Sequence, residues 1–372
     1  MSKSVLVTGG AGFIGSHLCD ELLEKNYKVR VLDSLSPQVH GPDLERPDYL
    51  ADDVELHLGD VRDPEAVRKA VQGVDAVYHF AAKVGVGQSM YEIAHYTATN
   101  NDGTAVLLEA LIKHPVEKLI VASSMSIYGE GLYRNPAGEC VNGTERPIEQ
   151  LQKHDWEVRD EKGNVLTPIP TPETKTPTLA SVYALSKYDQ ERMCMMIGRA
   201  YKIPTVALRF FNVFGTRQAL SNPYTGVLAI FSSRLLNDQP PVVFEDGLQQ
   251  RDFVHVKDIA QACRLSLEVP EAAHQVFNVG SGHRYTVQQI AASVARVLNK
   301  EYIEPEVTKN YRVGDIRHCF ADISLARRVL GYAPRVSLEE GLAQLSEWLE
   351  GQQAVDHVAK ARAELQERGL TV

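Results

Sequence analysis

A tyrosine and a lysine stand four positions apart in the segment Tyr183-Ala184-Leu185-Ser186-Lys187. On a helix this spacing places both side chains on one face. A phenol has an ordinary pKa of about 10, which makes it too weakly acidic to act as a base at neutral pH. A nearby ammonium group favours the phenolate, so the pair could take a proton from a hydroxyl group. The motif also occurs by chance in many helices and predicts no active site by itself.

Two neighbouring serines, Ser123 and Ser124, end the apolar run 118–124. A continuous apolar run is typical of a parallel strand that is covered on both faces. Open α/β sheets bind their ligands at the carboxyl ends of such strands. A serine hydroxyl at this position could hydrogen-bond the same substrate oxygen that Tyr183 deprotonates.

Three glycines with the spacing G-x-x-G-x-x-G lie in the segment 8–18, between an expected strand and an expected helix. The first glycine permits a tight turn, the second lets the backbone approach a pyrophosphate, and the third lets the helix pack closely on the strand. The phosphates would meet the positive end of the helix dipole. We therefore predict a dinucleotide site that includes Gly9, Gly12, Phe13, Ile14 and Gly15.

An aspartate, Asp33, ends the second expected strand, 18 residues after Gly15. A carboxylate there accepts hydrogen bonds from a ribose 2′-hydroxyl and repels a 2′-phosphate. No arginine or lysine follows before Arg46, so the sequence favours NAD over NADP. The third expected strand ends where the adenine would lie, and the fourth ends in small residues that admit the cofactor. Further candidate cofactor contacts at these strand ends are Ser34, Asp60, Val61, Phe80, Ala81, Ala82 and Lys83.

Short apolar runs alternate with amphipathic segments over the first two-thirds of the chain. The expected strands are 4–8, 28–33, 54–60, 76–81, 118–124 and 205–213, and the expected helices are 13–25, 64–72, 102–113 and 181–201. Strand and helix repeated in this way predict an α/β fold, a doubly wound parallel Rossmann sheet with right-handed crossovers.

Two stretches depart from this rhythm. Residues 131–177 are rich in proline, glycine and charge, which indicates a functional loop or an inserted subdomain. After about Asn222 the strands become short, with helices expected over 223–237, 257–267, 287–299 and 337–350. We predict an NAD-binding domain over 1–222, a smaller C-terminal α/β lobe over 223–352 that binds the substrate, and a helix-prone tail over 353–372.

The composition is that of an ordinary globular protein: 44% of the 372 residues are hydrophobic and 23% are charged. The net charge of −9 argues against nucleic-acid binding, and no apolar run is long enough to predict a membrane span. Five scattered cysteines without a C-x-x-C pair indicate neither disulfides nor a metal site. A strand-like run at the N-terminus leaves no room for a signal peptide, so we expect a cytoplasmic protein.

The chain resembles the extended short-chain dehydrogenases/reductases in the segments TGGAGFIG, FAA, YALSK, RFFNVFG and RDFVHVKDIA, and in the Ser-Ser-x-x-x-Tyr-Gly pattern at 123–129. Within this superfamily it is most similar to nucleotide-sugar 4-epimerases of the UDP-galactose 4-epimerase type. The resemblance runs from about residue 5 to 350 and is interrupted by the insertion.

The resemblance implies a role for each matching residue. Ser124 would hydrogen-bond the sugar hydroxyl, Tyr183 would be the base, and Lys187 would lower the pKa of the phenol and hold the nicotinamide ribose. Beside the cofactor it places Asn100, Ser123 and Phe211, and at the sugar diphosphate it places Asn212, Arg251 and Arg312. Ser126 would be a further substrate contact, and Cys319 would stand where the size of the sugar is selected. Arginine forks match phosphate oxygens, and a small residue at 319 would admit larger sugars.

The residues after Ser124 bear on the reaction. The family's dehydratases and decarboxylases carry a carboxylate there, whereas this chain has Met125, Ser126 and Ile127. We therefore expect 4-epimerisation through a transient 4-keto sugar that rotates about its diphosphate link. The alternatives are a nucleotide-sugar dehydratase, decarboxylase or ketoreductase, and a protein that senses NAD(H) without turnover.

The long segment between the active-site serine and Tyr183, together with residues 84–96, resembles a branch related to dTDP-L-rhamnose 4-epimerases. That branch favours a deoxyhexose on dTDP, with UDP-hexoses and UDP-hexuronates as alternatives. One cysteine and one histidine in the insertion, Cys140 and His154, do not make a closed tetrahedral metal site. The family also implies a homodimer built on the helices at 102–113 and 181–201.

Overall fold

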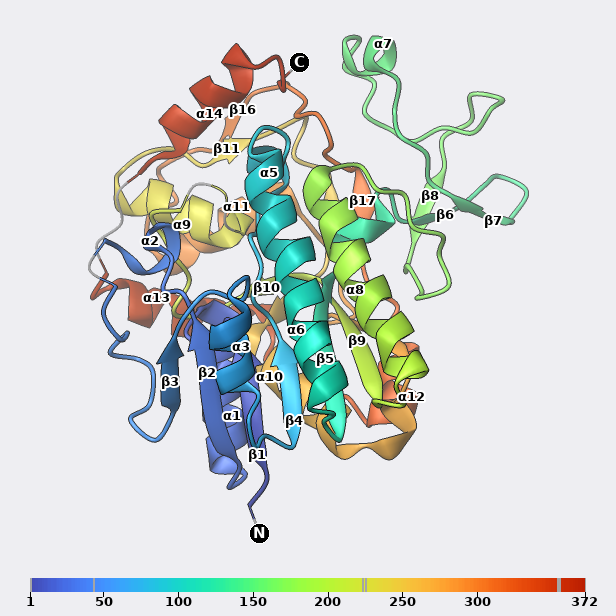
Figure 1. Cartoon of the computed structure of the whole chain (residues 1–372). Helices are drawn as coiled ribbons and strands as arrows, with labels where there is room; N and C mark the ends of the chain where they lie inside the picture. The colour runs from blue at the N-terminus through green and yellow to red at the C-terminus, as the bar shows by residue number, and fades with distance from the viewer. Residues whose placement is uncertain (1, 43, 223, 225, 353–355, 372) are drawn as a thin grey trace.

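A seven-stranded parallel sheet forms the centre of the chain, in the order β14-β9-β5-β4-β1-β2-β3 (Figure 1). The computed structural model describes residues 2–42, 44–222, 224, 226–352 and 356–371. The strands are β1 (Ser4–Thr8), β2 (Lys28–Asp33), β3 (Glu55–Leu58), β4 (Ala76–His79), β5 (Lys118–Ser124), β9 (Thr205–Phe210) and β14 (Val276–Val279). Every residue of β4, β5 and β9 is buried, which explains why these strands read as continuous runs in the sequence.

Helices cover both faces of the sheet. On one face α1 (Phe13–Glu24) packs against α10 (Val256–Glu268). On the other, α6 (Gly103–Lys113) lies beside α8 (Val182–Ala200), with α3 (Pro64–Ala70) packed on α6 (Figure 1). A large apolar cluster fills each interface. The predicted doubly wound α/β Rossmann fold is confirmed.

The two parts of the fold do not separate at residue 222, where the boundary between the two domains is predicted. Both α10 and β14 follow that residue, yet α10 packs on the main sheet and β14 forms its edge beside β9. The expected strand 205–213 is also divided, because β9 ends at Phe210 and β10 (Asn212–Phe214) leaves the sheet to pair with β13 (Phe253–His255). These pairings join residues far apart in the sequence, so no local pattern indicates them.

The later part of the chain forms a smaller lobe around its own apolar cluster. Its helices are α9 (Val227–Leu236), α11 (Val287–Val297) and α13 (Leu338–Leu349). Short strands complete it: β11 (Val242–Val243) pairs with β16 (Glu306–Val307), and β12 (Gln250–Arg251) lies between β15 (Tyr285–Thr286) and β17 (His318–Cys319). Thr286 and Ser337 begin α11 and α13 with capping boxes. Residues 223, 225 and 353–355 of the predicted lobe and tail lie outside the described residues.

Residues 131–177 form a small subdomain that projects from the main body (Figure 1). Its antiparallel sheet contains β6 (Leu132–Arg134), β7 (Cys140–Asn142) and β8 (Thr167–Ile169), with one helical turn, α7 (Ile148–Leu151). Tyr133, Val158 and Leu166 form a separate apolar cluster within it. The second of the two expectations for this stretch, an inserted subdomain, describes it better than a loop does.

The remaining elements connect these layers. They are α2 (Pro37–His40), α4 (Val86–Ser89), α5 (Ile93–Thr97), α12 (Ser324–Leu330), α14 (Val358–Glu367), the π-helical turn Ala98–Asp102 and the 3₁₀ turns Met125–Tyr128 and Pro270–Ala272. In the part of the chain that the structure describes, none of the helices combines the length and the apolar character needed to cross a membrane.

Candidate active site

The glycine-rich turn after β1 is shaped by three glycines. Gly9 has a φ of 70°, and a Cβ there would lie 2.8 Å from Ala81 N at the end of β4. A Cβ on Gly15 would lie 2.4 Å from Gly9 O, so only glycine lets α1 pack on the turn. Gly12 is the N-cap of α1 and, as a glycine, has no side chain to cap the first amides of the helix. The first amides of α1, among them those of Phe13 and Ile14, therefore suit an anion such as a pyrophosphate.

The Asp33 carboxylate braces this turn. Its Oδ2 accepts a hydrogen bond from Ala11 N at 3.0 Å, and its Oδ1 accepts one from Leu35 N at 2.9 Å. A carboxylate has about four lone-pair sites, so capacity remains for ribose hydroxyls. Ser34 beside it is exposed. The glycine turn, the open helix end and this carboxylate fit NAD, which would lie along them.

The next two strand ends are held by their own contacts. The Asp60 carboxylate binds Arg62 through two hydrogen bonds of 2.9 and 2.6 Å, and the Arg62 guanidinium lowers the pKa of that carboxyl. Val61 packs against Gly103 of α6, where a Cβ would meet its side chain. Phe80 meets the ring of Phe210 edge to face at 5.8 Å. The contacts of Asp60 and Val61 thus hold the strand end where the adenine is expected, and those of Phe80 hold the next strand end beside it.

Asn100 fixes the segment that follows β4. It is fully buried, its Oδ1 accepts from Lys83 N at 2.7 Å, and its Nδ2 donates to Lys83 O at 3.1 Å and to Ser186 Oγ at 2.9 Å. Lys83 Nζ donates to Ser36 Oγ at 3.1 Å, and burial lowers the pKa of this lysine. Asn100 thus positions the Ala81–Lys83 backbone, and its direct contact with the cofactor stays a prediction.

Tyr183 lies in the first turn of α8, beside the end of β5. Its backbone N–H donates to Ser89 Oγ at 3.0 Å, and its ring meets the edge of Tyr96 at 6.5 Å. Burial raises the pKa of Tyr183, while a hydrogen bond with the Ser124 side chain opposes that rise. Ser126 donates to Ser124 Oγ through both its N–H, at 3.2 Å, and its hydroxyl, at 2.9 Å. The structure therefore brings the predicted base and the predicted serine together.

Lys187 is buried one turn after Tyr183, and its ammonium turns to Gln190. The Nζ donates to Gln190 Oε1 at 2.7 Å, and burial lowers the pKa of Lys187 to about 8. The groups that act on the pKa of Tyr183 are burial and Ser124. Because the ammonium points along the helix to Gln190, the expected lowering of the phenol pKa by Lys187 stays a prediction.

Ser123 is committed to a buried ion pair. Its hydroxyl donates to Glu191 Oε2 at 2.6 Å, and Glu191 accepts two hydrogen bonds from Arg209 at 2.7 and 2.9 Å. Successive strand residues point to opposite faces, so Ser123 and Ser124 cannot serve the same contact. The geometry gives Ser123 a structural partner and does not support a cofactor contact through its hydroxyl.

Arg251 and Cys319 are neighbours in the register of β12 and β17. Arg251 Nη1 donates to Gln250 O and Arg317 O, each at 2.9 Å, and Nη2 donates to Ile316 O. These carbonyls fix the direction of the guanidinium. Cys319 is 1% exposed, and burial raises the pKa of its thiol to about 12, so the sulfur is a small neutral group beside the arginine.

Arg312 lies against α4. A Cβ on Gly87 of α4 would lie 4.0 Å from Arg312 Cδ, while Ser89 of the same helix holds Tyr183. Among the described residues the buried Asn212 Oδ1 has no hydrogen-bond partner, which costs about 1–3 kcal/mol unless a ligand supplies a donor. Phe211 packs against Tyr128 at 6.3 Å and belongs to the core.

The family model described as the NAD dependent epimerase/dehydratase family matches residues 5–150 and 162–280. The chain belongs to this family. Membership confirms the predicted superfamily, the NAD cofactor and the enzyme class. The two matched stretches include the glycine turn, Ser124, Tyr183, Lys187 and Arg251, while Arg312 and Cys319 lie beyond them.

Several relatives match nearly the whole chain. A dTDP-L-rhamnose 4-epimerase of Burkholderia thailandensis is 35% identical over 93% of this chain and 95% of the relative. A solved UDP-glucose 4-epimerase of Thermotoga maritima with UDP-glucose is 32% identical, with a TM-score of 0.75 over 93% of this chain and 98% of that one. A UDP-glucuronic acid 4-epimerase of Bacillus cereus in complex with UDP-glucuronic acid and NAD is 27% identical, with a TM-score of 0.77 over 93% and 99%.

Some residues of this family member escaped sequence reasoning. Ser89 holds the Tyr183 backbone across 94 positions, so no local pattern indicates it. Gln190 stands three positions after Lys187 on α8, a spacing that places both on one helix face and could have pointed to it. Within the described residues no group of three or more histidine, cysteine, aspartate or glutamate side chains is placed to hold a metal ion.

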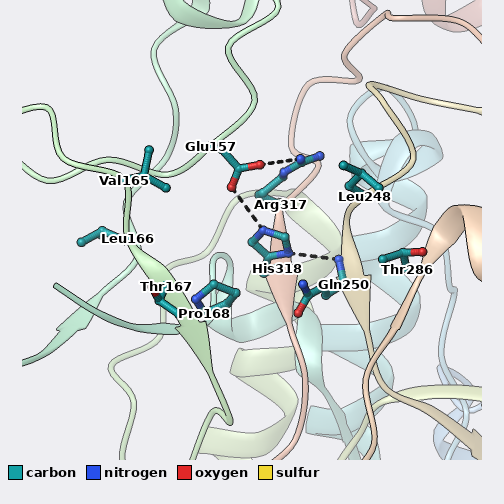
Figure 2. A pocket seen from close by; sticks show the side chains of 10 residues that line it. All are labelled: Glu157, Val165, Leu166, Thr167, Pro168, Leu248, Gln250, Thr286, Arg317 and His318. Carbon is teal, nitrogen blue, oxygen red and sulfur yellow. Dashed lines mark hydrogen bonds and ion pairs between the residues drawn. The ribbon is translucent and has the colours of Figure 1, made fainter. Parts of the chain in front are cut away.

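A cavity of about 380 Å³ opens between the inserted subdomain and the C-terminal lobe (Figure 2). Gln250 and His318 line it, whereas their neighbours Arg251 and Cys319 do not. Arg317 binds Glu157 at 2.6 Å in its wall (Figure 2), and the hydrogen bond from His318 together with Arg317 lowers the pKa of Glu157 to about 2. The bond between Glu157 and Arg317 therefore links the subdomain to the lobe whose strands carry Arg251 and Cys319.

Proposed function

We propose that this chain is an NAD-dependent nucleotide-sugar 4-epimerase that inverts carbon 4 through a transient 4-keto sugar. One observation carries the proposal. The Tyr183 phenol lies beside the Ser124 hydroxyl, which opposes the rise of the phenol pKa, at the carboxyl end of β5 in the sheet that bears the glycine turn. Residues 125–127 contain no carboxylate. A phenol and a hydroxyl suit proton transfer at an alcohol, and the missing carboxylate leaves a keto sugar without a nearby group for elimination.

The residues of the chain would act on the 4-oxygen of the sugar. Tyr183 takes the proton of the 4-hydroxyl, and Ser124 holds that oxygen in place. When bound, NAD supplies reversible acceptance of the hydride from carbon 4. After the sugar has turned about its diphosphate link, Tyr183 returns the proton to the same oxygen. Ser126 donates to Ser124 Oγ, so the Ser124 hydroxyl keeps its own proton for the 4-oxygen of either epimer.

The C-terminal lobe over 223–352 would hold the nucleotide diphosphate. Arg251 is fixed by three carbonyl groups, and Arg312 lies against α4, so both guanidiniums are positioned before the ligand arrives. Guanidinium forks match phosphate oxygens in geometry and charge. Asn212, the first residue of β10, would donate or accept at the same ligand.

For the sugar we propose a deoxyhexose on dTDP of the L-rhamnose type. The 35% identity to the Burkholderia enzyme over nearly the whole chain supports it. UDP-hexoses and UDP-hexuronates are the alternatives, supported by the Thermotoga and Bacillus structures.

We also propose a cytoplasmic homodimer that pairs α6 and α8 with their counterparts. Leu185 and Met196 on α8 are 46% and 53% exposed, which is a large apolar exposure for one helix. A single-sized dimer in solution that is lost in a Met196→Glu protein supports the dimer, and a wild-type monomer rejects it.

The test is incubation with a panel of dTDP- and UDP-sugars without added reductant, followed by NMR at sugar carbon 4. Inversion of a dTDP-deoxyhexose supports the proposal. A product that has lost water or carbon dioxide points to a dehydratase or decarboxylase, and consumption of added NAD(P)H points to a ketoreductase. A thermal shift with NAD but no turnover of any sugar points to a sensor.

A further inference from the structure

The ammonium of Lys187 is held by a residue that neither the family motif nor the proposed reaction accounts for. Lys187 and Gln190 are 3% and 0% exposed, and the Nζ donates to Gln190 Oε1 at 2.7 Å. Both lie on one face of α8. The partner of this lysine is therefore a neutral amide oxygen in a site closed to water.

The Gln190 amide is locked from its far side. Its Nε2 donates to Thr104 Oγ1 at 3.0 Å and also lies 3.2 Å from His79 Nε2. An amide nitrogen of glutamine only donates, so the amide cannot turn over without facing Lys187 with the wrong atom. The contacts of Nε2 consequently fix Oε1 toward the ammonium.

One arrangement of protons satisfies the bonds among Thr8, His79 and Thr104. In it Thr8 Oγ1 accepts from Phe80 N and Ala81 N, each at 3.2 Å, and gives its own proton to His79 Nδ1 at 2.9 Å. His79 then carries its proton on Nε2 and donates to Thr104 Oγ1 at 2.8 Å.

Thr104 completes the arrangement. Its hydroxyl accepts from His79 and from Gln190, and it donates to Asn100 O at 2.5 Å. Burial lowers the pKa of His79 to about 3, which keeps the ring neutral. Each hydroxyl in the network thus gives one proton and accepts two, and the chain of bonds runs from the end of β1 to Lys187.

The charged and titratable groups that face Lys187 do not replace Gln190. Glu191, the next residue of α8, is engaged by Arg209 and Ser123. Burial raises the pKa of the Cys194 thiol to about 12, so this group is uncharged at neutral pH, as is His79. No carboxylate hydrogen bond neutralises the ammonium in the described structure.

We propose that Gln190 is a positioning residue, which holds the Lys187 ammonium through a neutral acceptor. Thr104 fixes this amide, and His79 joins Thr104 to the strand ends of the NAD site. A neutral acceptor leaves the positive charge of Lys187 free to favour the Tyr183 phenolate, whereas a carboxylate would cancel it. The hydrogen bonds through Gln190, Thr104, His79 and Thr8 connect Lys187 to the backbone of Phe80 and Ala81. The position of Lys187 is therefore coupled to that of the strand end where the cofactor is expected. The inference rests on the proposed function for its catalytic consequence only.

The test is the titration of Lys187 in the free protein by NMR of ¹³C-labelled lysine, with a Lys187→Arg protein to assign the signal. In Gln190→Glu the pKa of Lys187 rises by about one unit or more, because a carboxylate favours the ammonium. In Gln190→Met it falls, because the ammonium loses its acceptor. A matched control is Gln249→Met, another buried glutamine, which leaves the Lys187 pKa unchanged.

Enzyme activity gives the second readout. In Gln190→Glu the carboxylate cancels the Lys187 charge that favours the Tyr183 phenolate, so the acid limb of the kcat profile moves to higher pH. Because each pKa unit is a factor of ten, kcat at pH 7 falls about tenfold. The value of KM changes little. If Gln190 were only structural, its replacement would change thermal stability but would move neither the pKa of Lys187 nor the acid limb of the kcat profile.

An unchanged Lys187 pKa in the folded Gln190→Glu and Gln190→Met proteins overturns the inference even where the wild type epimerises. If Gln190→Met fails to fold, Gln190→Glu alone decides, since it keeps the shape of the side chain. A wild type without epimerase activity rejects the proposed function, and the Lys187 shift then still supports the positioning by Gln190.

Discussion

Arg312 and Asp315 are joined by two hydrogen bonds, from Nε to Oδ2 at 3.0 Å and from Nη2 to Oδ1 at 2.8 Å. The pair leaves Nη1 of Arg312 for a ligand, and its carboxylate sets the plane of the guanidinium above the Phe244 ring. An arginine so oriented is prepared for a phosphate, because little side-chain freedom is left to lose on binding.

We therefore expect Arg312→Lys to weaken binding of the nucleotide sugar. A lysine keeps the charge but loses the planar fork, at a cost of about 1.5–3 kcal/mol for a charged hydrogen bond, or roughly tenfold or more in KM. The value of kcat should change little, since Arg312 acts on the part of the substrate that does not react. Steady-state kinetics with the best sugar of the panel measures both, and Arg328→Lys, on α12, is the control. A fall in kcat at unchanged KM contradicts this role.

Asp33 should control both the affinity for NAD and the preference over NADP. Asp33→Asn places an amide N–H against one of the two backbone N–H groups of Ala11 and Leu35, and removes the charge that repels a 2′-phosphate. We expect NAD to bind about tenfold more weakly, equivalent to about 1.4 kcal/mol, and the ratio of the two dissociation constants to approach one. Calorimetric titration with each cofactor tests this, with the α3 cap variant Asp63→Asn as the control. A ratio that does not change excludes the assigned role.

The basic side of the activity profile should report Lys187. The pKa of this lysine lies near 8 in the folded protein, below its ordinary value, because burial disfavours the ammonium. Above that pH the site loses the charge that favours the phenolate, so kcat falls as the pH rises. A Lys187→Arg protein stays charged throughout and should lack this limb, at whatever rate it turns over. The same limb in both proteins would assign it to another group.

The C-terminal helix α14 should hold the substrate side of the site in place. Glu364 Oε2 accepts from Tyr224 at 2.9 Å and from Tyr91 at 3.1 Å, and Val313 N donates to Leu370 O at 3.0 Å. We expect a protein that ends at residue 352 to bind nucleotide sugars several-fold more weakly, because α4 and the segment of Arg312 lose this support. Kinetics of the truncated protein are compared with those of Glu367→Gln, an exposed change on the same helix. An unchanged KM after truncation shows that α14 is dispensable.

The parts of the fold that the sequence predicts are those with a local signal. The bounds of β1 and β5 agree with the expected ranges because these strands are almost wholly buried and read as apolar runs. The bounds of β2 agree as well, although Lys28 is exposed and Arg30 half-buried. The division of 205–213 at Phe210 depends on where Val279 and Phe253 lie, and those pairings are set by the tertiary structure. The same holds for β14, a four-residue edge strand.

Some contacts of the candidate site also follow from local sequence signals, and others do not. Ser124 and Tyr183 are brought together as their positions at a strand end and a helix start predict. The partner of the lysine differs, because a side chain with four rotatable bonds can turn to Gln190 as easily as to the phenol. Ser123 shows the complementary case, since the ion pair of Glu191 and Arg209 that claims its hydroxyl has no signature in the sequence.

The central claim is that Tyr183 is the base at sugar carbon 4, and its most direct test is the rate of inversion in a Tyr183→Phe protein. We expect kcat to fall by about 10²–10⁴, the usual contribution of a positioned acid–base group, with NAD affinity and thermal stability close to those of the wild type. Inversion at carbon 4 is followed by NMR in both proteins under the same conditions. A Tyr183→Phe protein that inverts the sugar at the wild-type rate contradicts the account.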